Sequence, residues 1–360
     1  MDMRALLQKV IARARRKLFA RGILQVRKED DCLKWAIVGT GYMASTWADL
    51  LLTSRIGVLH AVCSRSRGRA EAFGHRFGCE AAFDSLDAML AGERERLDFV
   101  YVATPLHAHY AIIKRCIEAG VNVLTEKPAT PKADEWLELT QLAKSRGVVL
   151  IEGMWMVCLP TLAQANAWID AGLIGEIQWI KADIQKYQLS PDRQKEGEGG
   201  VLMDYGVYAL AFAGHFLSGA PDWISSRSRA GIHGDDADWA IQAGRRGRTA
   251  VINISSNSHA SSTAAVIGDC GMIEWSGPFN RTGAVTLYQF QSGEVKRKMF
   301  KYRQQGFEFQ LAEATRTLKN FLLESERLPH SMTFESLEFA ERARAHARDD
   351  PSSAGPSSSE

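Results

Sequence analysis

The stretch LKWAIVGTGYMA, residues 33–44, decides the fold of this chain. Residues 33–38 form a short, mostly apolar run, as expected for a strand buried in a parallel sheet. The pattern G-x-G-x-x-A follows from Gly39 to Ala44, and residues 45–52 are predicted to form a helix. In this strand–turn–helix setting the pattern predicts dinucleotide binding. Gly39 allows the tight turn, Gly41 lets the backbone approach a pyrophosphate, and the helix N-terminus attracts the anion.

The end of the next expected strand, 58–63, bears on the choice of cofactor. An NAD site usually has Asp or Glu at this point, where the carboxylate binds the ribose 2′-hydroxyl. This chain has Ser64 and Arg65 instead, with Arg67 and Arg69 close behind. A hydroxyl and a planar guanidinium suit a 2′-phosphate, so NADP(H) is favoured over NAD(H). The alternative is that these arginines are a solvated helix start.

Strands and helices continue to alternate up to residue 152. This alternation predicts a doubly wound parallel sheet, a Rossmann domain over residues 32–152. The further strands are expected at 98–103, 121–124 and 148–151, and the helices at 70–77, 85–90, 110–119 and 132–146.

After Glu176 the pattern changes to alternating runs joined by turns that contain glycine. It predicts a second, α+β domain over 153–348 with a large, mostly antiparallel open sheet. Strands are expected at 176–186, 238–243, 249–255, 264–267, 272–275, 284–290 and 294–302. Helices are expected at 307–324 and 334–347, with the option that the C-terminal helix returns to the Rossmann domain.

Composition excludes several classes of protein. Apolar residues make up 46% and charged residues 24%, and Lys+Arg 44 against Asp+Glu 42 gives a net charge of +2. These values argue against a disordered or collagen-like chain, and they give no electrostatic case for nucleic acid. Neither of two long uncharged stretches, 153–169 and 249–268, is apolar enough for a stable membrane span.

Both ends of the chain differ from the rest. Residues 1–31 form a basic extension with apolar residues at helical spacing and a twin-arginine pair, Arg15-Arg16, but no apolar run or cleavage site follows. Export is therefore disfavoured, and a packed helix, a frayed end or contact with a membrane surface remain open. Residues 349–360, DDPSSAGPSSSE, are expected to be a disordered tail.

The six cysteines form no C-x-x-C pair and no cluster with histidines. This spacing argues against a zinc or iron–sulfur site and against a disulfide framework. Reduced thiols and a cytoplasmic location are the simplest interpretation, with no metal expected.

Four features in order carry a family resemblance. They are the G-x-G-x-x-A pattern, T-P-x-x-x-H (Thr104, Pro105 and His109), Glu126-Lys127-Pro128 after a strand, and the antiparallel second domain. Together they resemble the Gfo/Idh/MocA family of oxidoreductases. The stretches Glu152–Trp155 and Gly199–Tyr208 are most similar to the branch that holds dimeric dihydrodiol dehydrogenases and glucose–fructose oxidoreductase.

The resemblance implies three catalytic residues. Lys127 would polarise the substrate oxygen, Tyr208 would donate or accept its proton, and Asp204 would orient the lysine or the sugar. An ordinary tyrosine keeps its proton up to a pH of about 10, so a nearby ammonium is the physical means to make that proton mobile. The alternatives are a helix-terminal charge for Asp204, a core aromatic for Tyr208 and a surface lysine for Lys127.

The resemblance, together with the fingerprint, also implies a cofactor site. Its predicted residues are Gly39, Thr40, Gly41, Tyr42, Met43, Ser64, Arg65, Arg69, Thr104, Pro105, His109, Glu126, Lys127 and Trp155. One position departs from the branch: Val157 stands where relatives often have arginine. The departure weakens the case for any particular substrate of the branch.

The function expected is an NADP-dependent oxidoreductase that acts on a secondary alcohol or carbonyl of a sugar, cyclitol or diol. One alternative is a non-catalytic, dinucleotide-binding sensor of the same fold. Another is an enzyme that keeps its NADP bound and alternates between substrates. The open face of the second sheet predicts a homodimer or homotetramer.

Overall fold

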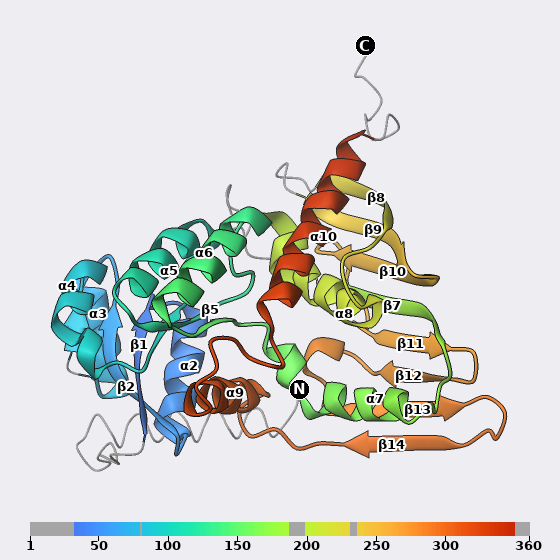
Figure 1. Ribbon diagram of the computed structural model, residues 1–360, viewed down its shortest axis with the longest axis horizontal. Helices are drawn as coiled ribbons and strands as arrows, with labels where there is room; N and C mark the ends of the chain where they lie inside the picture. The colour runs from blue at the N-terminus through green and yellow to red at the C-terminus, as the bar shows by residue number, and fades with distance from the viewer. Residues whose placement is uncertain (1–31, 80, 187–198, 231–235, 350–360) are drawn as a thin grey trace. The chain divides into compact units, whose positions relative to one another are not determined.

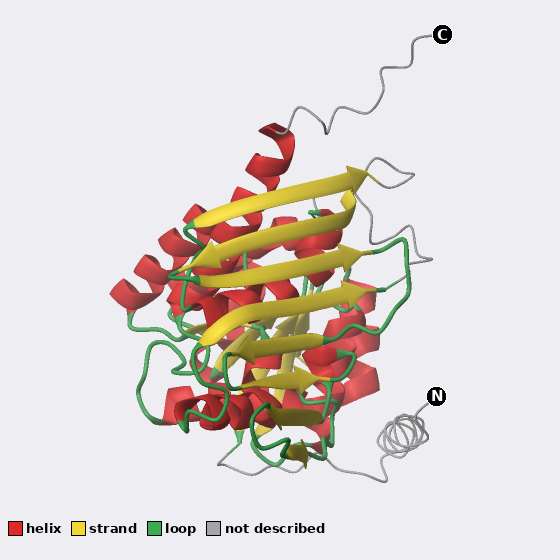
Figure 2. Ribbon diagram, turned by 90° about the vertical axis from the view of Figure 1, so that its right-hand side faces the viewer, coloured by secondary structure: helices red, strands yellow, loops and turns green. Residues whose placement is uncertain are grey.

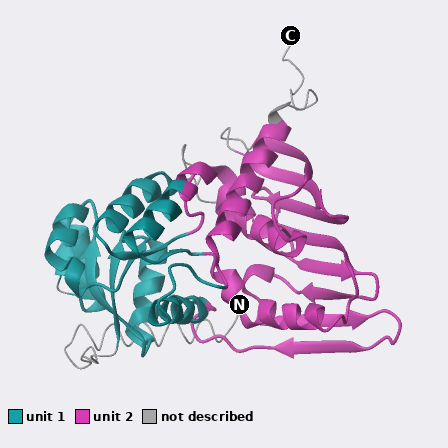
Figure 3. Ribbon diagram, viewed as in Figure 1, with its two compact units in different colours: residues 1–126, 138–153, 307–326 teal, residues 127–137, 154–306, 327–360 magenta. Residues whose placement is uncertain are grey.

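A computed structural model describes residues 32–79, 81–186, 199–230 and 236–349. The chain divides into two compact units (Figure 3). Unit 1 contains residues 1–126, 138–153 and 307–326, and unit 2 contains 127–137, 154–306 and 327–360. The basic extension 1–31 and the tail beyond Asp349 lie outside the described residues, and the expected domain boundaries remain predictions.

Unit 1 is built on a six-stranded parallel sheet (Figure 1). In spatial order its strands are β3 (Ala81–Phe83), β2 (Gly57–Cys63), β1 (Leu33–Val38), β4 (Phe99–Val102), β5 (Asn122–Thr125) and β6 (Leu150–Glu152). Its helices are α2 (Tyr42–Thr53), α3 (Arg67–Phe77), α4 (Leu86–Glu93), α5 (His109–Glu118), most of α6 (Ala133–Arg146) and α9 (Phe307–Lys319). The order 3-2-1-4-5-6 is that of a Rossmann fold.

Aromatic rings fill the centre of unit 1. Trp35 of β1 stacks on Phe99 of β4 at 4.6 Å between ring centroids, and Trp47 of α2 stacks on Tyr101 of β4 at the same distance. All four side chains are almost fully buried. These contacts hold the fingerprint helix α2 against the two central strands.

Unit 2 contains an eight-stranded sheet in which β10–β7 is the single parallel pair among the pairs described. In spatial order the strands are β14 (Val295–Met299), β13 (Ala284–Gln289), β12 (Gly271–Trp275), β11 (Ala264–Gly268), β7 (Ile177–Gln185), β10 (Arg248–Ser255), β9 (Asp236–Arg245) and β8 (Trp223–Ala230). The helices are α7 (Pro160–Asp170), α8 (Val207–Leu217) and α10 (His330–Asp349). The expected fold class, a Rossmann sheet with a mostly antiparallel second sheet, is confirmed.

One face of the unit 2 sheet is covered and the other is not. Helix α8 is apolar on nearly every side because it packs against β7 and β10 and also against α10. Figure 2 looks onto the opposite face, which no described helix of unit 2 covers.

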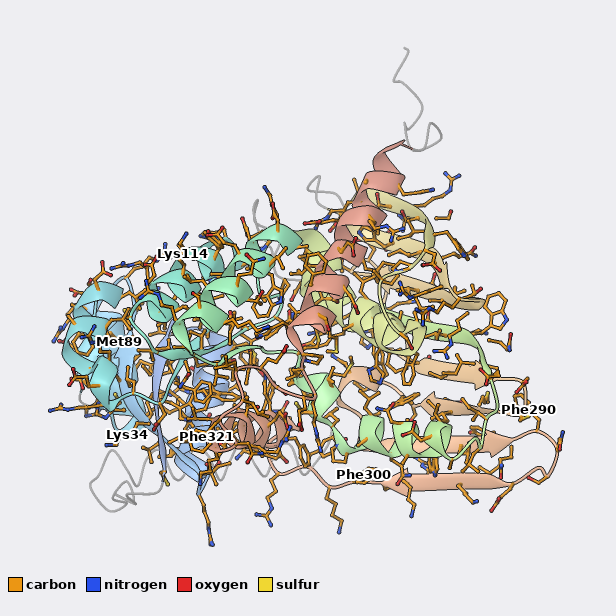
Figure 4. All side chains as sticks on the ribbon, viewed as in Figure 1. Lys34, Met89, Lys114, Phe290, Phe300 and Phe321 are labelled. Atoms are coloured by element: carbon orange, nitrogen blue, oxygen red, sulfur yellow. The ribbon has the colours of Figure 1, made fainter. Side chains whose placement is uncertain are left out.

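Burial varies sharply among the large side chains of unit 1 (Figure 4): Met89 of α4 is fully buried, whereas Phe321, after α9, is 94% exposed.

Three elements were not expected from the sequence: β3, α7 and β8. Strand β3 has only three residues, and α7 has a single charged residue, so neither has a clear periodic signal. Strand β8 reads WISSRSRA and is exposed at most positions. Its one buried residue is Ser226, whose hydroxyl donates to the Ala343 carbonyl at 2.6 Å. An edge strand held by polar contacts lacks the apolar alternation that identifies a strand.

Candidate active site

The carboxyl ends of four neighbouring strands are joined by backbone hydrogen bonds in unit 1. The Gly39 N–H donates to the Cys63 carbonyl at 2.8 Å, Ala103 donates to Val38 at 2.9 Å, and Glu126 donates to Val102 at 2.9 Å. The chain reverses its order across the sheet between β1 and β4. Ligands of open α/β sheets bind at such a switch point, beyond the carboxyl ends of the strands.

The two fingerprint positions, 39 and 41, differ in why they hold glycine. Gly39 has φ +112°, and a Cβ there would lie 2.3 Å from the Ala103 carbonyl oxygen, so only glycine fits. No described protein atom lies within 4 Å of a Cβ built at Gly41, so the protein's own packing does not require that glycine. Gly41 caps α2 without a side-chain hydrogen bond, and the first turn carries no acidic residue. An open helix N-terminus with room above it fits a dinucleotide pyrophosphate.

The other fingerprint residues divide by burial. Ala44 is fully buried and keeps α2 close to β1, whereas Tyr42 is 66% exposed. Thr40 and Met43 are half-buried. The structure therefore leaves Thr40 in the loop, and Tyr42 and Met43 in the first turn of α2, at least partly exposed, where the sequence predicted cofactor contacts.

The loop after β4 is held by its histidine. The buried His109 ring lies with Nε2 2.9 Å from the Thr104 carbonyl, which can only accept, so the ring N–H is the donor. This bond spans five residues and accounts for the T-P-x-x-x-H spacing. The Thr104 hydroxyl is buried without a hydrogen-bond partner among the described residues, and Pro105 is exposed. A polar buried atom at the switch point is a suitable contact for a ligand.

At the end of β2 the arginines are not equivalent. Arg67 pairs with Glu71, with 2.7 Å between Nε and Oε1, whereas Arg65 and Arg69 are exposed and no ion pair is described for either. Ser64 is buried. Burial, followed by the nearby charge of Asp84, raises the pKa of the Cys63 thiol to about 11. Arg65 and Arg69 are thus the arginines available for a phosphate, and the acidic neighbour Asp84 was missed from the sequence.

Glu126, predicted to contact the cofactor, is a buried residue of unit 1. The Tyr101 hydroxyl donates to its Oε1 in a short hydrogen bond. Tyr101 is 1% exposed and stacks on Trp47. Glu126 is therefore tied to the aromatic core, and sequence reasoning missed Tyr101 because it lies inside an apolar strand.

Unit 2 brings the three predicted catalytic residues together. The Lys127 ammonium donates to the Asp204 backbone carbonyl in a short hydrogen bond, and it lies 3.3 Å from Asp204 Oδ1. The same ammonium lies 5.0 Å from the centroid of the Tyr208 ring. The Lys127 side chain is 12% exposed, and Tyr208 is 7% exposed. This lysine is thus a partly buried cation, not the surface lysine of the alternative interpretation.

The helical segment that carries Asp204 and Tyr208 is irregular. Residues Leu202–Gly206 form a π-helical turn, and α8 begins at Val207. Residues four apart, such as Asp204 and Tyr208, share one face of a regular α-helix, and the wider turn changes this arrangement, although both residues still contact Lys127. π-helical turns frequently occur at functional sites.

A clamp holds the start of this segment. Gly199 and Gly200 have φ of +77° and +65°, and a Cβ at Gly200 would lie 1.5 Å from Asp236 Oδ1. The N–H groups of Val201 and Leu202 act to lower the pKa of Asp236, and Arg344 of α10 donates to the Gly199 carbonyl. Burial is the main reason that the pKa of Asp236 is raised to about 6.

Two further contacts surround the cluster. Trp155, in the short 3-10 helix Trp155–Cys158, donates its indole N–H to the Tyr208 hydroxyl at 3.0 Å. Lys186, just after β7, donates to the Tyr205 hydroxyl at 2.7 Å, a second lysine–tyrosine pair that the sequence analysis missed. Val157, where relatives of the branch often have arginine, is buried.

Two kinds of feature are absent from the described residues. No group of three or more His, Cys, Asp or Glu side chains in this part of the chain is arranged to hold a metal ion. No described helix is long and apolar enough to cross a membrane.

Residues 33–154 match a family model described as "Oxidoreductase family, NAD-binding Rossmann fold". Residues 162–274 match a second model, described as "GFO/IDH/MocA C-terminal domain". The chain belongs to the Gfo/Idh/MocA family of oxidoreductases. The family and the class of enzyme expected from the sequence are thereby confirmed. A nicotinamide dinucleotide is supported as the cofactor, whereas the preference for NADP(H) remains a prediction.

Two named relatives illustrate the range of the family. The chain is 37% identical over 160 residues to dTDP-3,4-didehydro-2,6-dideoxy-alpha-D-glucose 3-reductase of Streptomyces violaceoruber, covering 44% of this chain and 46% of the relative. It is 29% identical over 250 residues to trans-1,2-dihydrobenzene-1,2-diol dehydrogenase of Mus musculus, covering 67% and 74%. The match thus spans about half of the Streptomyces reductase and about three quarters of the mouse dehydrogenase.

Solved structures share the fold. An oxidoreductase from Agrobacterium radiobacter, in complex with NAD+, L-tartaric acid and magnesium, has a TM-score of 0.78 at 17% identity and covers 88% of this chain and 96% of its own. A 3-ketoreductase from Actinomadura kijaniata with NADP and TDP-benzene has a TM-score of 0.76 at 23% identity, covering 88% and 98%. At these identities the likeness shows the fold alone.

Proposed function

We propose that this family member is an NADP-dependent oxidoreductase that interconverts a secondary alcohol and a carbonyl group on a sugar, cyclitol or diol. The observation that carries the proposal is the partly buried Lys127 ammonium, held by Asp204 beside the Tyr208 ring. A site for a sensor would have no need of a cation and a phenol placed together in this way. The substrate class is taken from the sugar reductase and diol dehydrogenase named among the relatives.

Each residue of the cluster has a distinct role in this proposal. Negative charge develops on the substrate oxygen during hydride transfer to a carbonyl, and the Lys127 ammonium would stabilise it. Tyr208 would give a proton to that oxygen in reduction and take one in oxidation. Asp204 would hold the ammonium in place through its carbonyl and carboxylate oxygens. The hydride chemistry itself belongs to the nicotinamide when it is bound.

The experiment is a panel of sugars, inositols and diols with NADP+ and NAD+, followed by nicotinamide reduction. On an active substrate, Lys127→Met should lower kcat by at least about 100-fold, with cofactor binding largely kept, because the ammonium is lost at similar volume. Tyr208→Phe should lower kcat by a similar factor. The two losses should not add, because both groups act on one oxygen.

Lys319→Met is the matched control, since Lys319 is exposed at the end of α9. It should stay within a few-fold of the unmodified protein. A Lys127→Met variant that also stays within a few-fold would contradict the mechanism. No turnover on any panel member, with intact dinucleotide binding, would favour the sensor instead.

A further inference from the structure

We infer that Trp155 is a positioning residue for Tyr208, and that its indole N–H directs the phenol of Tyr208 for proton transfer. The inference rests on the proposed function and deepens it, since it assigns Trp155 to proton transfer and not to cofactor binding. Trp155 lies in the 3-10 helix Trp155–Cys158 and Tyr208 in the first turn of α8.

The geometry of the pair is specific. Trp155 Nε1 lies 3.0 Å from the Tyr208 hydroxyl oxygen, and the two rings meet edge to face, at 79° and 6.3 Å between centroids. Trp155 is 5% exposed and Tyr208 is 7% exposed, so bulk water competes little for this bond. A buried hydrogen bond of ordinary length between two rigid aromatic side chains fixes where the hydroxyl oxygen lies.

The chemistry of the two groups determines the direction of the bond. An indole N–H can only donate, so the Tyr208 oxygen is the acceptor. The hydroxyl proton is therefore directed to a different acceptor, as a proton donor to substrate requires. The bond also persists when Tyr208 loses its proton, and it is stronger to the phenolate because hydrogen bonds to a charged acceptor are stronger.

Two groups thus stabilise the same phenolate. Lys127 contributes a positive charge 5.0 Å from the ring centroid, and Trp155 contributes a direct hydrogen bond to the oxygen. The neighbouring position, Val157, contributes neither charge nor a side-chain donor. Asp204, 3.3 Å from the Lys127 ammonium, offsets part of the lysine's charge. The indole N–H of Trp155 is uncharged. The negative charge of Asp204 therefore does not offset its hydrogen bond to the Tyr208 oxygen as it offsets the charge of Lys127.

The test is the pH dependence of kcat in the full-length protein. Trp155→Phe keeps an aromatic ring and removes the donor. The pH profile of kcat has a limb that reports Tyr208, and it is recognised because Tyr208→Phe abolishes it. In Trp155→Phe this limb should move to higher pH by roughly 0.5–1 unit. The shift has the same sign in both directions of reaction, because the loss of a donor makes the phenol keep its proton to higher pH.

A second variant separates the hydrogen bond from packing. A benzothienyl analogue of tryptophan at position 155 keeps the bicyclic shape but has sulfur in place of the N–H, and it should reproduce the shift. Trp168→Phe is the matched control, because Trp168 is a buried tryptophan of α7. It should leave the limb where it is.

The outcomes separate this inference from the proposed function. In a Tyr208→Phe background, Trp155→Phe should change kcat by less than about twofold. A uniform fall in kcat with no shift of the limb, the same fall in the Tyr208→Phe background, or a change confined to the KM for cofactor would overturn the role of Trp155. If Lys127→Met and Tyr208→Phe leave turnover unchanged, the proposed function itself fails.

Discussion

At the scale of single residues, the structure distinguishes between arginines that the sequence presents as a group. Arg65, Arg67 and Arg69 all follow β2, but Arg67 is engaged by Glu71. In a Rossmann fold the ribose of a bound dinucleotide lies near the end of the second strand. Arg65 is the first basic residue after that strand and is exposed. It is therefore the best placed to bind a 2′-phosphate.

Arg65→Ala should weaken NADP(H) binding by about tenfold or more and leave NAD(H) binding nearly unchanged. A hydrogen bond to a charged group typically contributes about 1.5–3 kcal/mol, and only NADP carries the phosphate. Titration of both reduced cofactors by fluorescence measures the effect. Arg67→Ala is the control, because its guanidinium already pairs with Glu71 and should change neither affinity. An equal loss for both cofactors would show that Arg65 does not read the phosphate.

Gly200 has a left-handed backbone conformation and lies against the Asp236 carboxylate. Gly200→Ala should destabilise the protein by more than about 1 kcal/mol, because φ is +65° and the new Cβ would collide with the Asp236 carboxylate. Gly172→Ala is the matched control: φ is +71° there, but no described atom lies within 4 Å of its Cβ. Chemical denaturation of the two variants separates the collision from the backbone cost. Equal losses would mean that Asp236 moves aside freely.

At the scale of elements, the helical segment with Asp204 and Tyr208 depends on a carboxyl group from another element. Asp236 begins β9 and lies against the first N–H groups of the segment, with Arg344 of α10 3.9 Å away. Its pKa is raised to about 6, first by burial, while Arg344 and the backbone N–H groups oppose the shift. The folded protein therefore binds a proton between about pH 4 and 6 that the unfolded chain has already lost.

The raised pKa of Asp236 makes the stability of the protein depend on pH. Because the folded-state pKa is raised, Asp236 makes the free energy of unfolding fall as pH rises through about 4 to 6. Asp236→Asn removes that dependence. The free energy of unfolding of the variant minus that of the unmodified protein should therefore rise by roughly 1–3 kcal/mol from pH 4 to pH 7. Denaturation curves at both pH values measure it. Asp222→Asn, at an exposed ion pair with Arg245, should show no comparable gain. A pH-independent difference for Asp236→Asn would contradict the prediction.

At the scale of the whole molecule, the uncovered face of the unit 2 sheet is the feature that bears on assembly. Trp179 of β7 and Trp223 of β8 are 47% and 46% exposed there. They lie in one row of paired residues that crosses all eight strands and is largely apolar. The row is Val295, Tyr288, Met272, Ile267, Trp179, Thr249, Gly244 and Trp223. A row of this kind is typical of a protein interface.

We expect a homodimer or a homotetramer built on this face. Trp179→Glu should shift the protein to a smaller species, because a charge would be buried without a partner. Light scattering at micromolar concentration measures the assembly. Phe321→Glu, at a 94% exposed position in unit 1, is the control and should leave the assembly unchanged. A monomeric unmodified protein would refute the prediction.

The fold could be predicted from the sequence because its signals are local. Strand 33–38 is observed as expected, since a buried parallel strand needs an apolar run of that length. The fingerprint and the alternation after it predict the Rossmann sheet for the same reason. Strand β8 could not be predicted, because an exposed edge strand is stabilised by its neighbour β9 and by α10, not by its own apolar pattern.

The candidate site was determined partly by sequence and partly by tertiary structure. The family resemblance predicted Lys127, Asp204 and Tyr208 as catalytic residues, and the motifs that carry this resemblance are local patterns in the sequence. Only the folded chain decided which groups surround them. The Lys127–Asp204 contact spans 77 residues and the Trp155–Tyr208 bond spans 53. Packing of distant segments sets such contacts, and it also buries Asp236 against Gly200, whereas the Arg67–Glu71 pair is local because the two residues lie four apart in α3.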